Sequence, residues 1–119
     1  MFKRLDNVIL CVNNMKESVR FYRDIIGLQQ MADEPEWKTF SLGETTLALR
    51  PWLPDTEDER HVKHGISLCF LVGDVNAAVR ELESMGAHVL VSPCDEEHGR
   101  VAEIADPDGY ILMLMTPFK

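Results

Sequence analysis

The sequence of 119 residues has no apolar run approaching the length of about 18 residues that a membrane-spanning helix needs. We therefore expect no contact with a membrane. Basic residues are also few: 12 Lys and Arg stand against 20 Asp and Glu, which gives a formal net charge of −8. Because a phosphate backbone needs a basic surface, this balance argues against nucleic-acid binding. It is compatible with a cationic ligand, although solubility alone accounts for it.

Cysteine is scarce as well. Cys11, Cys69 and Cys94 cannot all pair within one chain, and none belongs to a C-x-x-C motif. Reduced thiols are typical of a cytoplasmic protein, so we expect a cytoplasmic location. With 45% apolar and 27% charged residues, the composition is that of a globular domain, and the chain is long enough to bury a core without disulfides.

One order of elements occurs twice along the chain. The β-branched run Val8–Val12 predicts a strand, and the next residues predict a helix that Asn14 caps and Gly27 ends. Three short strand-like segments follow. The same order returns with a strand at 66–72, a helix capped by Asp74, and three more strands. The halves match at an offset of about 60 positions, which indicates an internal duplication.

We predict a single α+β domain made of two tandem modules, at about 1–52 and 65–119, joined by an acidic linker at 53–64. The linker contains His61 and His64. A solvated connection is the better interpretation there, since zinc sites need three or four convergent ligands. Each module leaves one sheet face without a helix, and two such faces turned towards each other would enclose a ligand-binding cleft.

Three segments carry a family resemblance. They are LDNVILCVNNMKESVRFYRDIIGL, FLVGDVNAAVRELESMGA and HGRVAEIADPDGYILML. Together they resemble the vicinal oxygen chelate superfamily, which includes glyoxalase I, bleomycin-resistance proteins, fosfomycin-resistance enzymes and extradiol dioxygenases. The resemblance covers nearly the whole chain. It implies paired βαβββ modules whose mixed sheets curve around a cleft, and it implies a homodimer.

The resemblance also implies where a metal would be held. In the metal enzymes of this family each module gives one ligand from its first strand and one from its last, usually His or Gln with Glu. The matching positions here are Asn7, Leu47, Ser67 and Met113. None is an imidazole or a carboxylate, whereas a divalent ion needs several oxygen or nitrogen donors with anionic charge. We therefore predict that no metal and no other cofactor is bound.

Alternation along a strand places residues two apart on the same face, so each of these positions predicts further members of a ligand-binding wall. The predicted wall is mainly aliphatic and sulfur-bearing and comprises Asn7, Ile9, Cys11, Leu47, Leu49, Ser67, Cys69, Ile111, Met113 and Met115. Trp37 and Trp52 are candidate flat platforms, and Tyr110 is a candidate at the cleft mouth. His98 and Arg100 are the polar candidates of a covering loop. Ordinary core packing is the alternative for the apolar members.

These observations favour a metal-independent small-molecule-binding protein that sequesters a largely apolar organic ligand, which could be cationic, with antibiotic resistance as the expected role. The alternative is a lyase, isomerase or dioxygenase-type enzyme of the same superfamily with a non-standard site. Glu103 and His98 would then be candidate base and acid, and Cys11 or Cys69 a candidate nucleophile, although no partner that would activate a thiol is identifiable. A dimerisation module with a closed cleft is a third interpretation. The catalytic residues of any such enzyme stay unassigned.

Overall fold

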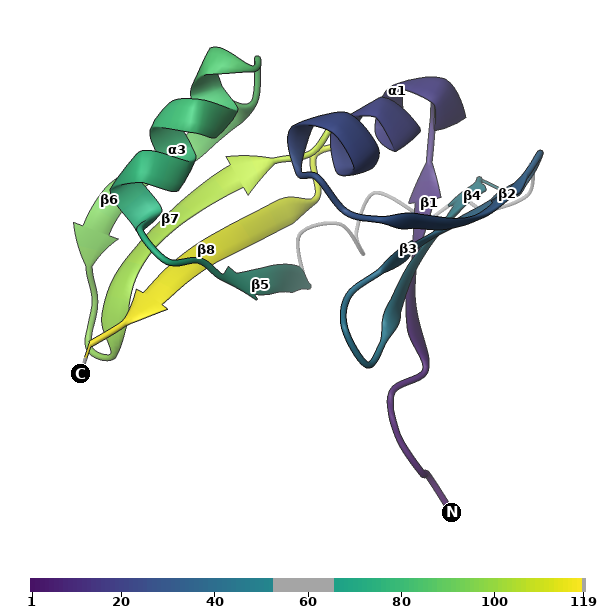
Figure 1. Cartoon of the computed structure of the whole chain (residues 1–119), viewed down its shortest axis with the longest axis horizontal. Coiled ribbons are helices and arrows are strands. Elements are labelled where there is room, and N and C mark those ends of the chain that lie inside the picture. The colour runs from purple at the N-terminus through teal and green to yellow at the C-terminus, as the bar shows by residue number, and fades with distance from the viewer. Residues whose placement is uncertain (53–65, 119) are drawn as a thin grey trace. The chain divides into compact units, whose positions relative to one another are not determined.

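The computed structural model describes residues 1–52 and 66–118. The chain divides into two units, Met1–Thr56 and Glu57–Lys119, and each is described by itself. The predicted linker at 53–64, with His61 and His64, lies outside the described residues. In each unit a helix lies on a four-stranded sheet (Figure 1). None of the helices in the described part is long and apolar enough to span a membrane.

The first unit builds one βαβββ module. Its strand order is β1-β4-β3-β2, with β1 and β4 parallel and the other neighbours antiparallel. Asn14 caps the helix as predicted, because its side-chain oxygen accepts a hydrogen bond from the N–H of Glu17 at 3.0 Å. The elements are β1 (Asn7–Val12), α1 (Met15–Arg20), η1 (Phe21–Ile25), β2 (Gln30–Glu34), β3 (Trp37–Ser41) and β4 (Thr46–Pro51).

One detail of this helix differs from the expectation of a single α-helix up to Gly27. The last turn, η1, is π-helical, and the N–H of Ile26 donates to the carbonyl of Phe21 at 2.8 Å. Phe21 and Tyr22 are both buried in this turn. Gly27 then ends the helix as predicted, with a φ of 85° that an L side chain rarely adopts.

The second unit repeats the module with the same connections. Its strand order is β5-β8-β7-β6, again with the first strand parallel to the last. Asp74 caps the helix by accepting from the N–H of Ala77 at 3.1 Å. The predicted duplication is therefore confirmed as two βαβββ modules. The elements are β5 (Ser67–Leu71), α3 (Val75–Ser84), β6 (His88–Asp95), β7 (Gly99–Ala105) and β8 (Ile111–Pro117).

Each sheet buries the side chains that point towards its own helix. In the first unit Tyr22 packs near Phe40 with ring centroids 6.3 Å apart. In the second, Val75 and Val79 of α3 form a buried cluster with Ala102 of β7. Burial of such apolar surface is the main stabilising term of a small domain. The buried sheet residues of this kind are Leu10, Val12, Phe40, Leu47, Leu49, Ala102, Ile104, Leu112 and Leu114.

The turn DPDG sets the start of β8. Its first residue, Asp106, is buried, and its carboxylate accepts hydrogen bonds from the N–H groups of Asp108 at 2.9 Å and Tyr110 at 2.8 Å. Gly109 has a φ of 92°, which favours glycine. The turn thus fixes which residue of the following strand pairs first with β7, and hence which side chains face the helix.

Candidate functional site

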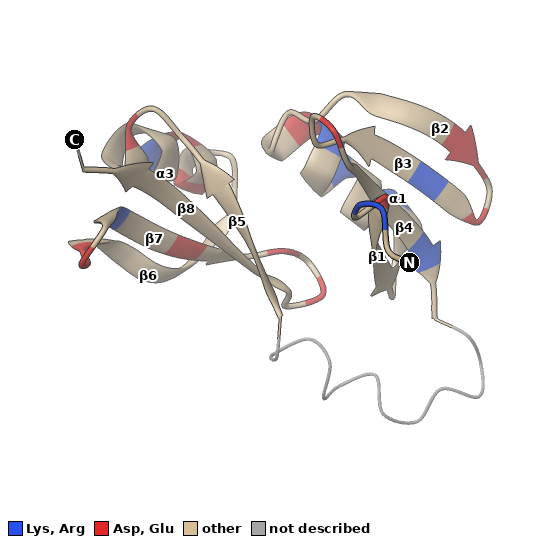
Figure 2. Cartoon of the chain, turned by 90° about the horizontal axis from the view of Figure 1, so that it is seen from below, with Lys and Arg blue, Asp and Glu red and all other residues tan. Residues whose placement is uncertain are grey.

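The face of the second sheet that points away from α3 is the most apolar candidate surface, and we call it the second helix-free face. The registers of β5, β8 and β7 place three cross-strand rows on it. Its members are Ser67, Cys69, Leu71, Val101, Glu103, Ala105, Ile111, Met113 and Met115. In Figure 2, β5 and β8 carry no Lys, Arg, Asp or Glu.

Several apolar side chains of this face are accessible. Leu71 is 71% exposed, Cys69 is exposed, and Met113 and Met115 are half-buried. Adjacent accessible apolar side chains on one face of a sheet form a surface that a ligand or a partner can cover. The predicted placement of Ser67, Cys69, Ile111, Met113 and Met115 on one face is confirmed by the pairing of β5 with β8.

Glu103 is the charged member of the second helix-free face. It lies in β7 directly opposite Met113, whose partner on the other side is Cys69. These three side chains therefore form one row with a carboxylate, a thioether and a thiol, and Val91 of β6, which pairs with Glu103 on its other side, extends the row to the fourth strand. Glu103 was predicted only as a candidate base, and its place beside Met113 was not predicted.

The corresponding face of the first sheet, the first helix-free face, is more polar. Asn7, Ile9 and Cys11 lie on it as predicted, because they alternate with the buried helix-facing residues of β1. The Asn7 amide donates to the Asp6 carboxylate at 3.0 Å. Cys11 pairs in register with Arg50, which brings a cation onto this face.

Leu47 and Leu49 were expected on the first helix-free face, and this placement is wrong. Both are 0% exposed, and Leu49 pairs in register with the buried Leu10 on the helix side. Two residues separate Gly43 from β4, whereas only one separates Gly109 from β8. Because strand side chains alternate, this one-residue difference moves every side chain of β4 to the other face. Ala48, not Leu47, is thus the structural counterpart of Met113.

The three aromatic candidates are placed differently from one another. Trp37 begins β3 and is half-buried, and alternation puts it on the same face as Thr39, which pairs with Ala48. Trp52 follows β4 and is half-buried. Tyr110 is only 7% exposed. Its side chain is therefore part of the interior in this structure, which does not match a role at an accessible cleft mouth.

The two polar candidates near the β6–β7 turn do not lie on the second helix-free face. The His98 side chain is 84% exposed, with the Glu97 carboxylate 3.8 Å away. Arg100 belongs to β7, not to a loop, and its guanidinium donates to the side-chain oxygens of Asn76 and Asp95, both at 2.9 Å. Since Asn76 is part of α3, Arg100 ties the sheet to its helix.

The predicted acid–base pair does not converge. His98 and Glu103 are five residues apart along an extended segment, which corresponds to roughly 17 Å. General acid–base chemistry requires both groups within hydrogen-bonding reach of one substrate. An enzyme that used Glu103 would need a different acid.

The residues at the family's metal positions do not fit a divalent ion. The first unit offers Asn7 and, with the corrected register, Ala48, while the second offers Ser67 and Met113. A neutral amide, a hydroxyl and a thioether supply no anionic charge, and alanine has no donor. Within residues 1–52 and 66–118, no group of three or more His, Cys, Asp and Glu side chains could hold a metal ion.

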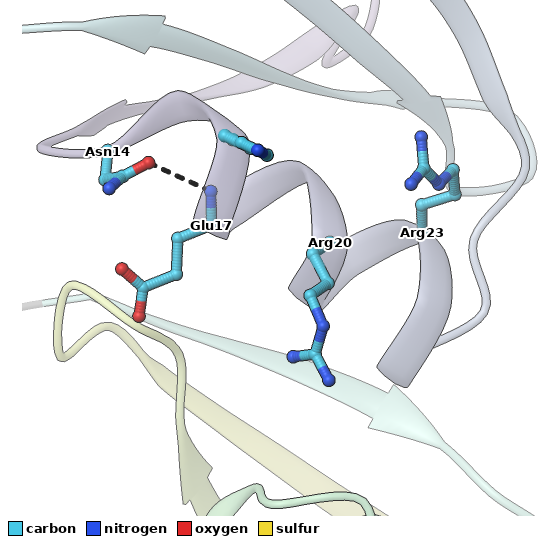
Figure 3. A pocket seen from close by; sticks show the side chains of 5 residues that line it. Asn14, Glu17, Arg20 and Arg23 are labelled. Carbon is cyan, nitrogen blue, oxygen red and sulfur yellow. Dashed lines mark hydrogen bonds between the residues drawn. The ribbon is translucent and has the colours of Figure 1, made fainter.

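A surface pocket of about 350 Å³ lies along α1 and η1 (Figure 3). The carboxamide oxygen of Asn14 is already used as the helix cap, and Arg23 donates to both carboxylate oxygens of Asp24 at 2.8 and 3.1 Å. The pocket is therefore a row of charged side chains along one short helix, and no predicted site residue belongs to it. Its lining residues are Asn14, Lys16, Glu17, Arg20 and Arg23.

Shifted pKa values mark two ion pairs at the surface of the first unit. A hydrogen bond from the Arg23 guanidinium lowers the pKa of Asp24, and the same contact raises the pKa of Arg23. A hydrogen bond from the Lys38 ammonium lowers the pKa of Asp33. All three groups are solvent-exposed, so these pairs stabilise local structure slightly and offer no chemistry.

The fold and the metal positions together define the class of protein. The chain belongs to the Glyoxalase/Bleomycin resistance protein/Dioxygenase superfamily, whose family model matches residues 4–114. Within that superfamily it is a member without the usual metal ligands, as predicted from Asn7, Ser67 and Met113.

A sequence relative and two solved structures are similar to this chain over most of its length. The uncharacterised protein YraH of Bacillus subtilis is 31% identical over 88% of this chain and 91% of its own. The crystal structure of TnmS3, an antibiotic-binding protein from Streptomyces sp. CB03234, is 24% identical, covers 98% of both chains and has a TM-score of 0.82. Lactoylglutathione lyase from Agrobacterium tumefaciens is 20% identical over 98% and 95% of the chains, with a TM-score of 0.74. The two structures share the fold.

Proposed function

We propose that this protein binds a small, largely apolar organic molecule on the second helix-free face, without a metal, and acts by sequestering it. The observation that carries the proposal is the group of accessible apolar and sulfur-bearing side chains on β5 and β8, above all Leu71, Met113 and Met115. By the family resemblance, metal-dependent members have a metal ligand at the position of Met113. In this chain the position holds methionine, whose flexible, polarisable side chain suits varied apolar ligands.

The size of the apolar contribution can be bounded. Burial of about 200 Å² of apolar surface gains roughly 5 kcal/mol at about 25 cal/mol per Å². Loss of translational and rotational freedom offsets much of this gain. A micromolar dissociation constant corresponds to about 8 kcal/mol. A ligand held tightly by this face must therefore also make polar contacts or be unusually large.

The shared fold of TnmS3, an antibiotic-binding protein, supports sequestration of an antibiotic-like molecule as the form of this activity. A homodimer and a cytoplasmic location belong to the same proposal. Exposed thiols at Cys69 and Cys94 suit a reducing compartment. Light scattering of the purified chain should give twice the monomer mass of 13.6 kDa.

An enzyme is the second candidate, since lactoylglutathione lyase shares the fold. Such an activity would have to use a site other than the family's metal site, with Glu103 as the carboxylate available on the second helix-free face. Turnover of a methylglyoxal–thiol adduct by the purified protein, lost in Glu103→Gln, would establish this function in place of sequestration.

The binding proposal is tested with 1-naphthylmethanol, a neutral, fluorescent, mostly apolar probe. We expect saturable binding with one-to-one stoichiometry. Met113→Asp should weaken it by roughly tenfold or more, because the ligand would then cover a charged group. Met31→Asp is the matched control, since Met31 is 64% exposed in β2 of the other unit, and it should leave binding unchanged.

Two outcomes would contradict the proposal. The first is the absence of saturable binding of this probe and of hydrophobic antibiotics in a thermal-shift screen, where a ligand of the native state raises the melting temperature. The second is an equal loss of binding in the Met113 and Met31 variants. Metal analysis of protein purified without chelator tests the metal-free part separately, and stoichiometric zinc, nickel, manganese or iron would overturn it.

A further inference from the structure

We propose that Glu103 makes the second helix-free face selective for organic cations, meaning molecules with an apolar body and a protonated amine. This inference rests on the function proposed above and names its ligand class. It assigns Glu103 as the residue that recognises the cation, and it places the apolar part of the ligand over β8 and β5.

The register supplies the geometry. Glu103 lies at the centre of β7, and its cross-strand neighbour Met113 lies at the centre of β8. Residues that pair directly in an antiparallel ladder point to the same side and have neighbouring Cβ atoms. The carboxylate thus lies between Met113 of β8 and Val91 of β6, with Val101 and Ala105 beside it on its own strand.

No group among residues 1–52 and 66–118 forms an ion pair with Glu103. Among the described residues its carboxylate forms neither a hydrogen bond nor an ion pair, although the side chain is half-buried. None of the other eight members of the face is Lys or Arg. His88 of β6 stands opposite Ala105, a diagonal position, and it forms no ion pair with Glu103.

A carboxylate in these surroundings discriminates between ligands. A neutral ligand that covers it removes water and returns no donor, which costs free energy. A protonated amine replaces that water with a charge-assisted hydrogen bond, which is about twice as strong as a neutral one. An anionic ligand is repelled. The protein's net charge of −8 acts in the same direction at longer range.

Three probes of nearly equal size separate these contributions: 1-naphthylmethylamine, which is protonated at neutral pH, neutral 1-naphthylmethanol, and anionic 1-naphthylacetate. With the full chain at low ionic strength, we expect the amine to bind about tenfold more tightly than the alcohol. We expect the acetate to bind most weakly. In Glu103→Gln the amine and the alcohol should bind equally.

Two further variants keep the test sharp. Glu83→Gln removes the same charge from an exposed position on α3, and it should leave the preference for the amine intact. Glu103→Lys should reverse the order and favour the acetate. Circular dichroism checks that each variant is folded.

The outcomes separate this inference from the proposed function. If all three probes bind the wild-type protein equally and Glu103→Gln changes nothing, the cation selectivity is overturned while apolar binding stands. If Glu83→Gln abolishes the preference as fully as Glu103→Gln does, net charge and not Glu103 is responsible, and the inference fails. If no probe binds, the proposed function fails and the inference fails with it.

Discussion

The helix-free faces of the two sheets share one topology and differ in chemistry. In the first sheet the central positions are Thr39 and Ala48, both buried, and Arg50 adds a cation. In the second sheet the corresponding positions are Glu103 and Met113, both half-buried and accessible. Of the residues predicted to share one wall, those of the second unit lie together on its helix-free face, whereas Leu47 and Leu49 of the first unit face the helix.

The helix-facing sides of the same sheets are alike. Leu10 pairs with Leu49 in the first sheet, and Phe70 pairs with Leu114 at the matching place in the second. A helix packs on these positions in both units, so a polar or much smaller side chain would leave a cavity or an unsatisfied group. Packing against the helix thus restricts one face of each sheet to apolar side chains, while the side chains of the other face differ between the two units.

The largest loss of stability should follow truncation of a β4 side chain that faces the helix. Leu47→Ala should destabilise the protein by about 2 to 5 kcal/mol, because it leaves a cavity in the helix-facing core. Ile9→Ala, at a position 46% exposed on the opposite face, should cost only about 0.5 kcal/mol. Urea denaturation of both variants measures the difference. Equal losses would mean that Leu47 does not face the helix.

The next largest effect should distinguish the turn before β8 from the turn before β4, because they contribute differently to stability. Asp106→Ala removes a buried acceptor of two N–H groups and should cost about 1 to 3 kcal/mol. In the first unit the Thr45 hydroxyl donates to the carbonyls of Leu5 and Asp6 in exposed surroundings, so Thr45→Val should cost about 0.5 kcal/mol. Thermal unfolding compares them, and a larger loss for Thr45→Val would contradict the turn's role.

A variant of Arg100 tests whether the two faces of β7 have different roles. Arg100→Ala removes hydrogen bonds to Asn76 and Asp95 and should destabilise the protein by about 1 kcal/mol. The same variant should bind 1-naphthylmethanol as the wild type does, because the guanidinium lies on the helix side. A clear loss of probe affinity in a folded variant would place Arg100 in the ligand site instead.

The smallest effect concerns acid stability. Asp24 and Asp33 have lowered pKa values in the folded state, so each favours folding above the ordinary value of 3.8. That contribution is lost as the pH falls through the lowered value. Asp24→Asn should therefore flatten the acid limb of the stability curve slightly, and only slightly because the pair is exposed. Stability measured by urea between neutral and acidic pH tests this, and a steeper limb would contradict it.

Local signals predicted most of the fold. Asn14 and Asp74 cap the two helices, and Gly27 and Gly86 follow them with φ values of 85° and 97°. Each of these features depends on a few neighbouring residues, so the sequence reveals it. The faces of β1, β5 and β8 were predicted from the family's ligand positions and the two-residue repeat of a strand, because ILMLM in β8 is apolar on both faces.

The site was predicted less completely, for two physical reasons. A single extra residue between Gly43 and β4 reversed the faces of Leu47 and Leu49, and register depends on turn geometry that composition does not reveal. Arg100 was misjudged because its partner Asn76 lies 24 residues away along the chain. Glu103 was noticed, but its pairing with Met113 emerges only from the β7–β8 register.

We propose above all that the second helix-free face binds an apolar molecule. The most direct measurement is a titration of 1-naphthylmethanol into protein labelled on its methionine methyl groups, followed by NMR. We predict that the methyl signals of Met113 and Met115 shift together and saturably, while the signal of Met31 in β2 stays in place. Saturable binding that moves Met31 and leaves Met113 and Met115 unchanged would contradict the claim.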